Sequence, residues 1–496
     1  MLENRSFDHM LGFSQIEGIN ASNNMPTRID GLEGIESNAS PGVGDVRVSF
    51  PADFIINPDP GHEFTDVREQ LCGKDGTYST PTLSPGSIDS SIDNGGFVSN
   101  YVGKYPGQDP NIVMRCYSPN QLPVLTTLAR EFAVCDHWFS SMPGPTWPNR
   151  FFVHAATAGG LDHSPPLPKE IASFTGLTYR FSNGTIFDLL DNEGLDWAIY
   201  CGDAFPQSLH MQGMVDNCIK GRFIQFNNFK RDLQSGDFPK SYVFIEPDWH
   251  PFTQFRCGNS QHPVDDVTRG EWLLKEVYEA IRNSPLWEKS LLIITYDEHG
   301  GFYDHVSPPT TVNPGDGATN PDNDRYGFNF QQLGVRVPAV VVSSHIPRGT
   351  IDHRTYEHSS VLTTVENIFR LSNLTERDKH TAPLDGMLSL SQPRTDAPMT
   401  LPTPAASGFR CTPESELVAE LRYFFGRIPT FLHLNSPKPP DPSLAGFVHV
   451  ALLRKMSSSS SEDKARLLSQ AGRINNQADA LRFLRHNNAP FGSILR

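Results

Sequence analysis

The stretch from Ser290 to Gly301, with the sequence SLLIITYDEHGG, most constrains the fold of this chain. Its first half is an apolar run rich in branched residues, which is typical of a strand buried on both faces of a parallel sheet. The run ends at Asp297 and Glu298, and the two glycines that follow allow the backbone to leave strand geometry. Because ligands of open α/β sheets bind at the carboxyl ends of strands, these acids predict a metal or phosphate site. The alternative is a solvated acidic turn after a core strand.

Helical and extended patterns alternate on both sides of this stretch. The spacing of apolar residues predicts helices over residues 121–132, 185–191, 270–283 and 361–369. Short apolar runs predict strands over residues 197–200, 241–247, 290–296 and 337–343. Residues 14–60 are rich in Gly, Asn, Asp and Pro, which indicates irregular loop. This alternation indicates an α/β protein, in which the strand over residues 290–296 is central.

The C-terminal part of the chain has a different composition. Residues 1–391 hold all the candidate site residues and are predicted to form the catalytic domain. Residues 392–404 contain four prolines and are predicted to be a linker. Residues 405–496 are predicted to be a helical extension, with candidate helices over residues 414–425, 462–474 and 477–486.

Composition excludes some classes of protein. The formal net charge of −15 leaves no broad basic field for a phosphate backbone, so no nucleic-acid partner is expected. The apolar runs are too short to span a bilayer. Seven scattered cysteines make a thiolate zinc site improbable, and their odd number leaves at least one thiol free. No signal peptide is visible, and the compartment stays open: a truncated N-terminus would imply a secreted or periplasmic protein, and otherwise a cytoplasmic one is expected.

Thr146 is the candidate nucleophile. It lies between Pro145 and Pro148, whose rings make the loop stiff, and a helical pattern follows at residues 151–156. A hydroxyl held at the start of a helix is well placed to act on a phosphate. The alternative is a proline-rich turn whose threonine caps the helix.

Polar groups stand at the predicted ends of strands or starts of helices in five separate segments: Glu3-Asn4, His62, Thr146, Asp297-Glu298 and His358. A set of carboxylates, an amide and a hydroxyl suits a hard divalent ion such as Ca²⁺, Mg²⁺ or Mn²⁺. A threonine hydroxyl bound to such an ion loses its proton more readily and can attack phosphorus. Arg150 and nearby histidines can supply charge stabilisation and a proton for the leaving group.

Four motifs together resemble the phosphoesterase family, which includes non-specific and bacterial phospholipases C and acid phosphatases and belongs to the alkaline-phosphatase-like superfamily. The motifs are ENRSFDH at residues 3–9, PTWPNR at 145–150, DEHGGFYDHV at 297–306 and YEHSSV at 356–361. They occur in the order found in the family, and the resemblance extends from Glu3 to about Leu371.

The resemblance implies a doubly wound, mostly parallel sheet flanked by helices. It implies one divalent metal ion (Ca, Mg, Mn or Zn) held by Glu3, Asn4, Asp297 and Glu298, with Thr146 as nucleophile. By the same resemblance His62, His262 and His358 are catalytic and line the phosphate pocket, and Arg150 and Asn149 bind substrate. Supporting positions are expected for His154, Glu246 and His305.

One departure from the family concerns the N-terminus. In the family an apolar strand precedes the Glu-Asn pair, whereas here only Met1 and Leu2 do. The catalytic domain is therefore expected to lack its first strand, through truncation or loss. The resemblance implies a metal-dependent phospholipase C that releases diacylglycerol and a phosphorylated headgroup and contacts membranes peripherally. The alternatives are an acid phosphatase acting on phosphomonoesters and an inactive truncated homologue.

Overall fold

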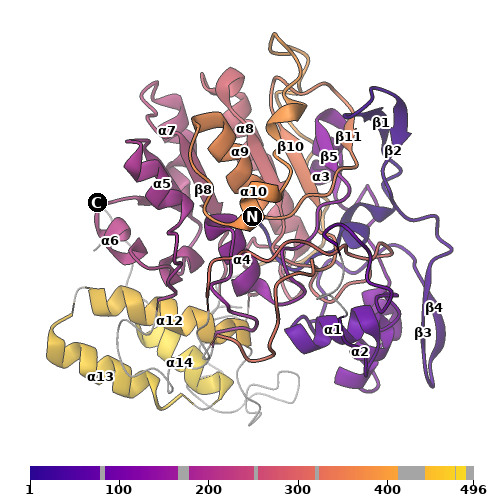
Figure 1. The fold of residues 1–496 in the computed structure, drawn as a ribbon, viewed down its shortest axis with the longest axis horizontal. Helices are drawn as coiled ribbons and strands as arrows, with labels where there is room; N and C mark the ends of the chain where they lie inside the picture. Colours follow the sequence, from indigo (N-terminus) through magenta and orange to yellow (C-terminus); the bar gives the residue numbers. More distant parts are fainter. Residues whose placement is uncertain are drawn as a thin grey trace.

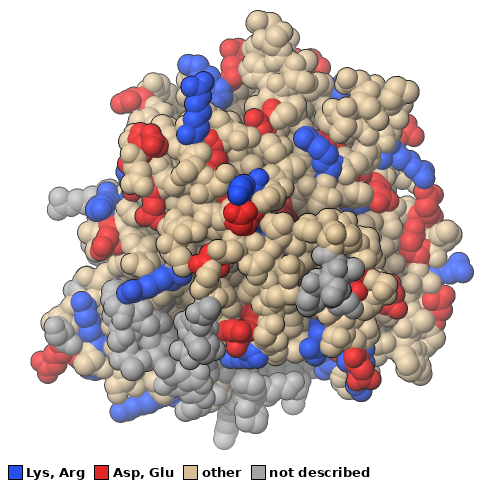
Figure 2. All heavy atoms as spheres, viewed as in Figure 1, with Lys and Arg blue, Asp and Glu red and all other residues tan. Residues whose placement is uncertain are grey.

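The computed structural model describes residues 1–487 apart from residues 79–83, 166–177, 251–254, 319–322, 412–441, 458 and 475. The predicted helix over residues 414–425 lies outside this part of the chain. Figure 1 shows a central sheet flanked by helices, with the C-terminal helices gathered at one end. Acidic and basic side chains are interspersed on the face shown in Figure 2.

A mixed sheet of six strands forms the centre of the molecule (Figure 1). Its strands, in spatial order, are β2 (Pro26–Arg28), β1 (Glu17–Asn20), β11 (Thr350–Asp352), β5 (Ala133–Cys135), β10 (Ala339–Val342) and β9 (Leu292–Thr295). Strand β11 runs parallel to β1 and β5, whereas β10 is antiparallel to both β5 and β9. Strands β9 and β10 are the predicted strands over residues 290–296 and 337–343.

A second sheet holds three parallel strands, in the order β7 (Phe223–Gln225), β6 (Trp197–Cys201) and β8 (Tyr242–Glu246). The first two residues of the chain lie between the two sheets. The amide of Leu2 donates to the carbonyl of Thr295 at 2.9 Å, and the amino group of Met1 lies 3.5 Å from the carbonyl of Ile245. Strand β9 is the last strand in the order of the six-stranded sheet, so the prediction that it is central is wrong; its other edge contacts the first residues of the chain through Leu2. Four of the seven strand pairs described in the two sheets are parallel, which agrees with the predicted fold class.

Two groups of helices pack with these sheets. Helices α3 (Pro123–Glu131), α7 (Phe229–Gln234) and α8 (Val267–Arg282) form one group, and α4 (Thr146–Ala155), α5 (Ile186–Asn192), α9 (Ser359–Phe369) and α10 (Glu376–His380) form the other. The predicted helices correspond to α3, α5, α8 and α9 within a few residues. The remaining helices of the catalytic part are α1 (Phe64–Cys72), α2 (Phe97–Lys104) and α6 (Met214–Ile219). None of the described helices is both long and apolar enough to cross a bilayer.

The prediction of irregular loop over residues 14–60 is wrong in part. This region contains β1 and β2 of the main sheet and a separate hairpin of β3 (Ser37–Ser40) and β4 (Gly44–Arg47). The strands are short and rich in Gly, Asn and Ser, so their own β-propensity is low. Pairing with distant chain supports β1, as where Ile19 faces Thr350 across the β1–β11 ladder, whereas β2, β3 and β4 pair with neighbouring segments.

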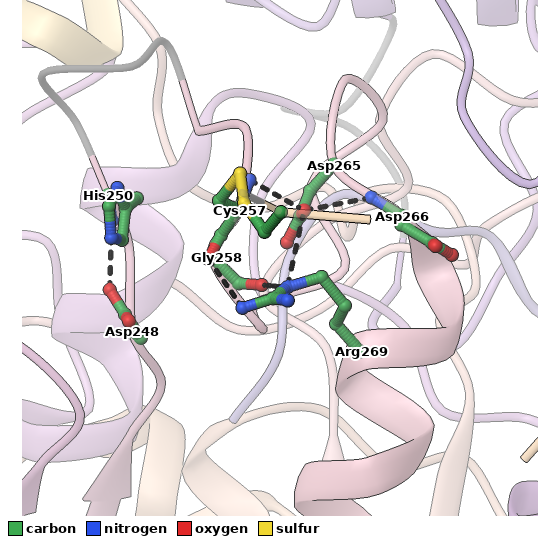
Figure 3. The surroundings of a disulfide bond; sticks show 8 residues. Asp248, His250, Cys257, Gly258, Asp265, Asp266 and Arg269 are labelled. Atoms are coloured by element: carbon green, nitrogen blue, oxygen red, sulfur yellow. Dashed lines mark hydrogen bonds and ion pairs between the residues drawn. A yellow bond between two sulfur atoms is a disulfide. The ribbon is translucent and has the colours of Figure 1, made fainter. Parts of the chain in front are cut away.

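The predicted linker is ordered along helix α8. The Lys275 ammonium donates to the carbonyl of Leu401 at 2.6 Å, and the Arg282 guanidinium donates to the carbonyl of Ala397 at 3.0 Å. Further on, Cys411 forms a disulfide with Cys257, a pairing that sequence spacing alone does not predict. Figure 3 shows Cys257 held in place, since its amide donates to Asp265 and its carbonyl accepts from Arg269.

Three described helices form the C-terminal region: α12 (Pro442–Ser457), α13 (Ser461–Ala471) and α14 (Gln477–Asn487). The last two were predicted, whereas α12 was missed. Helix α12 is buried over most of its described length, including its polar residues His449 and Arg454, which is typical of a helix enclosed by protein. It packs against α4, where the Phe447 ring lies 5.6 Å from the Trp147 ring. The C-terminal region therefore contacts the residue that follows Thr146.

We expect Gly446→Ala to loosen this contact. A β-carbon at Gly446 would overlap the indole of Trp147, which is fully buried and has no room to move aside. Overpacking of this kind costs about 1–3 kcal/mol in unfolding free energy. Chemical denaturation should detect the loss, and hydrolytic activity should fall with it because Trp147 adjoins Thr146.

Gly103→Ala is the matched control. Gly103 also lies in a helix, but a β-carbon there would meet nothing within 4 Å. The control should keep its activity and gain about 0.5–1 kcal/mol of stability. Equal stability of the two variants would contradict the packing of α12 on α4.

Candidate active site

Thr146 is the first residue of helix α4, and its side chain is buried. Pro145 occupies the N-cap position in an extended conformation, and no side chain caps the helix. The alternative in which Thr146 acts as a cap is therefore wrong. Instead, the Thr146 Oγ1 hydroxyl donates to Asn4 Oδ1 at 3.3 Å. The hydroxyl thus sits at a helix N-terminus, directed at an amide from the start of the chain.

Asn4 connects Thr146 to the acids that follow β9. Its backbone amide donates to Asp297 Oδ1 at 3.0 Å, and the next amide, of Arg5, donates to the carbonyl of Glu298 at 2.9 Å. Asn4 has a φ of 57°, a left-handed conformation that Asn adopts more readily than most residues. A β-carbon on Gly300 would overlap the Asn4 carbonyl, so this close approach requires glycine. Segments almost three hundred residues apart in sequence therefore meet, as predicted.

Three carboxylates are buried together here: Glu3, Asp297 and Glu298. Burial, followed by the nearby charge of Asp297, raises the pKa of Glu3 well above its usual range. Burial likewise raises the pKa of Glu298. Glu3 Oε2 and Glu298 Oε1 have no hydrogen-bond partner among the described residues. Buried carboxylate oxygens without partners are costly, and a hard divalent cation would satisfy them, so the predicted ligand set fits such an ion.

Arg150 provides positive charge beside these acids. Its Nε donates to Asp297 Oδ2 at 3.1 Å, and its Nη2 donates to the carbonyls of Met1 and Leu2 at 3.3 Å. The guanidinium also stacks on the Trp249 ring at 4.4 Å. These contacts hold the N-terminal segment against the end of β9. The predicted contact of Arg150 with substrate stays a prediction.

Asn149 organises the loop before helix α4. Its Oδ1 accepts from the amide of Met142 at 3.0 Å, and its Nδ2 donates to the carbonyls of Gly144 and Pro145 at 3.0 and 3.1 Å. The side-chain amide therefore fixes the backbone that presents Thr146. Substrate binding by Asn149 stays a prediction, and these contacts favour a positioning role.

His358 contacts the end of β9 from the N-terminus of α9. Its Nε2 lies 2.7 Å from the carbonyl of Asp297, and its Nδ1 lies 3.3 Å from the Trp138 indole Nε1. Both ring nitrogens are thus engaged with protein groups. His358 supports the backbone of Asp297 in this structure, and its predicted role at the phosphate stays a prediction.

His62 and His262 lie together on another side of the acids. His262 Nε2 is 3.5 Å from Asp59 Oδ2, and His62 Nδ1 is 3.9 Å from the same oxygen. The loop that carries His262 contacts the segment that carries Glu3. Glu3 donates its amide to the carbonyl of Ser260 at 2.9 Å, two residues before His262. Asp59 was missed by the sequence analysis, because its segment DPGH has the composition of an exposed turn.

Glu246, His154 and His305, which were predicted to be supporting residues, lie in the surroundings of the candidate active site. Glu246 accepts from the amides of Gln207 and Ser208, and Gln207 donates to Glu3 Oε1 at 3.4 Å. His154 packs edge-on against Phe244, and burial lowers its pKa to about 3. The third, His305, belongs to a charged network that includes Asp8.

His305 lies between two carboxylates. Its Nδ1 is 2.7 Å from Asp8 Oδ2, and its Nε2 is 3.2 Å from Asp30 Oδ1. Burial opposes the charged form, but the hydrogen bonds to Asp30 and Asp8 outweigh it and raise the pKa of His305 to about 10. The imidazolium and Arg336, which binds Asp8 Oδ1 at 3.0 Å, fix the segment that follows Asn4.

This network predicts a pH-dependent stability. Because the folded-state pKa of His305 is raised, its stabilisation is full below about pH 6.5 and is lost as the pH rises towards 10. In that window the group lowers the unfolding free energy by up to about 1.4 kcal/mol per pH unit. Urea unfolding of His305→Gln between pH 6.5 and 10 should therefore show a flatter profile than the unchanged protein.

The exposed His380 provides the control, since His380→Gln should retain the original slope. If the unfolding free energies of His305→Gln and the unchanged protein varied with pH in the same way, His305 would not be a protonated imidazolium in the folded protein.

Comparison with known proteins gives consistent matches. The model of the Phosphoesterase family matches residues 1–372. Non-specific phospholipases C3 and C6 of Arabidopsis thaliana are 37% and 39% identical over 420 and 417 residues, which cover 81% of this chain and 74% of each relative. Phospholipase C B of Mycobacterium tuberculosis is 27% identical over 410 residues, covering 74% of this chain and 72% of the relative.

One solved structure, a protein of the alkaline phosphatase superfamily from Vibrio parahaemolyticus, is 15% identical with a TM-score of 0.31. The match covers 55% of this chain and 65% of that chain, and the likeness is too low to carry an argument.

Proposed function

Because the chain belongs to the phosphoesterase family and is a hydrolase of phosphoric esters, we propose that it acts as a phospholipase C with Thr146 as nucleophile. The proposed reaction cleaves a glycerophospholipid into diacylglycerol and a phosphorylated headgroup. The observation that carries it is the hydrogen bond from Thr146 Oγ1 to Asn4, whose own amide binds Asp297. The substrate class is supported by the names of the relatives, two of them more than a third identical.

In this proposal Glu3, Asn4, Asp297 and Glu298 hold one divalent cation. Such an ion supplies Lewis-acid polarisation and lowers the pKa of a neighbouring hydroxyl. Thr146 Oγ1 attacks phosphorus, and the bond from phosphorus to the diacylglycerol oxygen breaks. The N-terminal amides of α4 face the charge that develops on the phosphoryl oxygens.

The proton that Thr146 Oγ1 loses passes through His62 or His262 to the departing oxygen, which leaves as the diacylglycerol hydroxyl. The second half of the proposed reaction restores the enzyme. Water then attacks the phosphothreonine, the bond from phosphorus to Thr146 Oγ1 breaks, and the hydroxyl regains its proton. Arg150 and Asn149 position Asp297 and the Thr146 loop through their hydrogen bonds.

The test compares a phosphodiester lipid with a phosphomonoester. Purified protein supplied with Ca²⁺, Mg²⁺, Mn²⁺ or Zn²⁺ should release diacylglycerol from phosphatidylcholine in mixed micelles, with a higher kcat/KM than for p-nitrophenyl phosphate. A chelator should remove the activity, and one of the ions should restore it. A preference for the monoester would favour the acid phosphatase instead, and no turnover of either substrate with any ion would favour an inactive homologue.

A further inference from the structure

We propose that Gln70, on helix α1, is a positioning residue that holds the loop of His62 against the turn that follows Glu298. The Gln70 side chain is 1% exposed, and its amide joins two segments of the candidate active site. Its Oε1 lies 2.8 Å from His299 Nε2, and its Nε2 donates to the carbonyl of Gly61 at 2.7 Å. Gly61 precedes His62, and His299 follows Glu298. One buried side chain therefore links the two segments directly.

The orientation of the Gln70 amide follows from its partners. The Gly61 carbonyl only accepts, so the group that faces it is the NH₂ of Gln70. Asn100 Nδ2 donates to the carboxylates of Asp66 and Glu69 at 3.1 and 3.0 Å. Its Oδ1 is therefore the atom that accepts from Gln70 Nε2, at 3.0 Å. Both donor hydrogens and the acceptor oxygen of Gln70 thus have protein partners, so its amide is committed to holding the protein.

The His299 ring carries this constraint to Glu298. Because Gln70 Oε1 only accepts, His299 Nε2 carries a proton and donates it to this hydrogen bond. The other ring nitrogen, Nδ1, lies 3.3 Å from Glu298 Oε2, which also accepts from the amide of Gly300 at 2.7 Å. The ring is 1% exposed and packs edge-on against Phe97 at 5.9 Å. Gln70 therefore fixes an imidazole that contacts the side chain of Glu298.

The other end of the link has no spare room. Gly301 has a φ of 75°, and a β-carbon there would lie 2.4 Å from the Gly61 carbonyl oxygen. The loop of His62 thus lies directly against the turn that follows Glu298, with its carbonyl turned to Gln70. The preceding carbonyl, of Pro60, lies 3.0 Å from His62 Nδ1. The backbone that Gln70 anchors therefore also orients the His62 ring.

The position of His62 matters through the proposed function, on which this inference rests. In that function a proton passes through a histidine to the departing oxygen. Such a transfer needs the donor and acceptor atoms within about 2.6–3.2 Å of each other. A displacement of about 1 Å lowers the rate by about 10²-fold. Gln70 therefore acts on the reaction through His62, without touching the reacting atoms.

Gln70→Met tests this role, because methionine has a similar length and forms none of the three hydrogen bonds. The substrates are p-nitrophenylphosphorylcholine and a short-chain phosphatidylcholine below its micelle concentration. Both place the same headgroup on the enzyme, but the lipid oxygen must be protonated to leave, whereas p-nitrophenolate leaves without a proton. We expect kcat/KM to fall by about 10²-fold for the lipid. The fall for the nitrophenyl ester should be at least about tenfold smaller, since protonation of the leaving group does not limit it.

Gln121→Met is the matched control. Gln121 is also buried, and its Nε2 donates to the carbonyl of Ala52 at 2.7 Å while its Oε1 accepts from the amide of Ser118 at 3.0 Å. The control should change kcat/KM for both substrates by the same factor. Gln70→Asn is a second variant that retains an amide and disturbs folding less. It is one methylene too short to reach both His299 and Gly61, so it should show the same selective loss on the lipid.

Amide hydrogen exchange of the full chain gives a readout that does not depend on activity. Mass spectrometry of the peptide that contains Gly61 and His62 should show faster exchange in Gln70→Met than in Gln121→Met. An equal loss on both substrates in the Gln70 variants, or unchanged exchange, would overturn the inference. If the unchanged protein cleaves neither substrate, the proposed function fails, and the exchange rates alone decide whether Gln70 holds the loop of His62.

Discussion

Replacing Thr146 with alanine is expected to lower the hydrolysis of a chromogenic phosphodiester by at least about 10⁴-fold, because the attacking oxygen is removed. The hydroxyl makes one described hydrogen bond, to Asn4 Oδ1. Its loss costs about 1 kcal/mol of stability, so the variant should fold. Steady-state kinetics and a thermal unfolding curve on the same preparation give both quantities.

Thr146→Ser is the conservative control, since serine keeps a hydroxyl on the same carbon at the start of α4. It should retain a substantial part of the activity, whereas Thr146→Ala should not. Unchanged turnover by Thr146→Ala would remove the nucleophile assignment.

Glu298→Gln is expected to act in opposite directions on activity and on stability. Without a cation, Glu298 is a buried carboxylate close to Glu3 and Asp297, and the guanidinium of Arg150 pairs with Asp297. A neutral isostere relieves the crowding of negative charge, so the metal-stripped variant should unfold at a higher temperature than the metal-stripped original. The same change removes a ligand of the proposed cation, and activity should fall by about 10³-fold or more.

Glu366→Gln is the control, because it replaces a buried carboxyl group that is not a proposed metal ligand. Glu366, on α9, also has a raised pKa, of about 9, through burial and its contact with Asp378. Glu366→Gln should leave metal binding and activity unchanged. If Glu298→Gln kept full activity, or bound the cation as tightly as the original, Glu298 would not be a ligand.

The predictions from sequence were best where the apolar pattern was long and regular. Helix α8 and strands β9 and β10 were predicted because their apolar residues pack in the core and mark the pattern of each element. Helix α12 was missed because it is buried over most of its described length, so its apolar residues are not confined to one face and give no amphipathic pattern. Strand β1 was missed because its pairing with the distant β11 is not visible in the sequence, and β3 was missed because this short hairpin strand is rich in Ser and Asn, which have low β-propensity.

The sequence also predicted some residues of the candidate site and missed others. The resemblance placed Asn4, Thr146 and Asp297 in one site, and the structure brings them together through two hydrogen bonds. It did not identify Asp59, whose closeness to His262 depends on how two distant loops pack. Nor does a motif distinguish a side chain that faces substrate from one that holds a neighbour, as the contacts of Asn149 illustrate.

The contact between the C-terminal region and helix α4 was likewise invisible in the sequence. Gly446 and Phe447 lie against Trp147, so the region predicted as an extension packs on the catalytic part of the chain. The disulfide between Cys257 and Cys411 ties the preceding segment to the loop that leads to His262. Asn4 near the start of the sequence and helix α12 in the C-terminal region therefore both contribute to the surroundings of Thr146.

Acid quenching during turnover most directly tests whether Thr146 forms a covalent bond to the substrate phosphorus. Trypsin releases Thr146 within the peptide of residues 131–150, which also contains Ser140 and Ser141. After a rapid quench with a phosphodiester substrate, fragmentation mass spectrometry should place the phosphorylated headgroup on Thr146. A quenched peptide that stays unmodified while product forms, or a phosphoryl group on another residue, would contradict nucleophilic attack by Thr146.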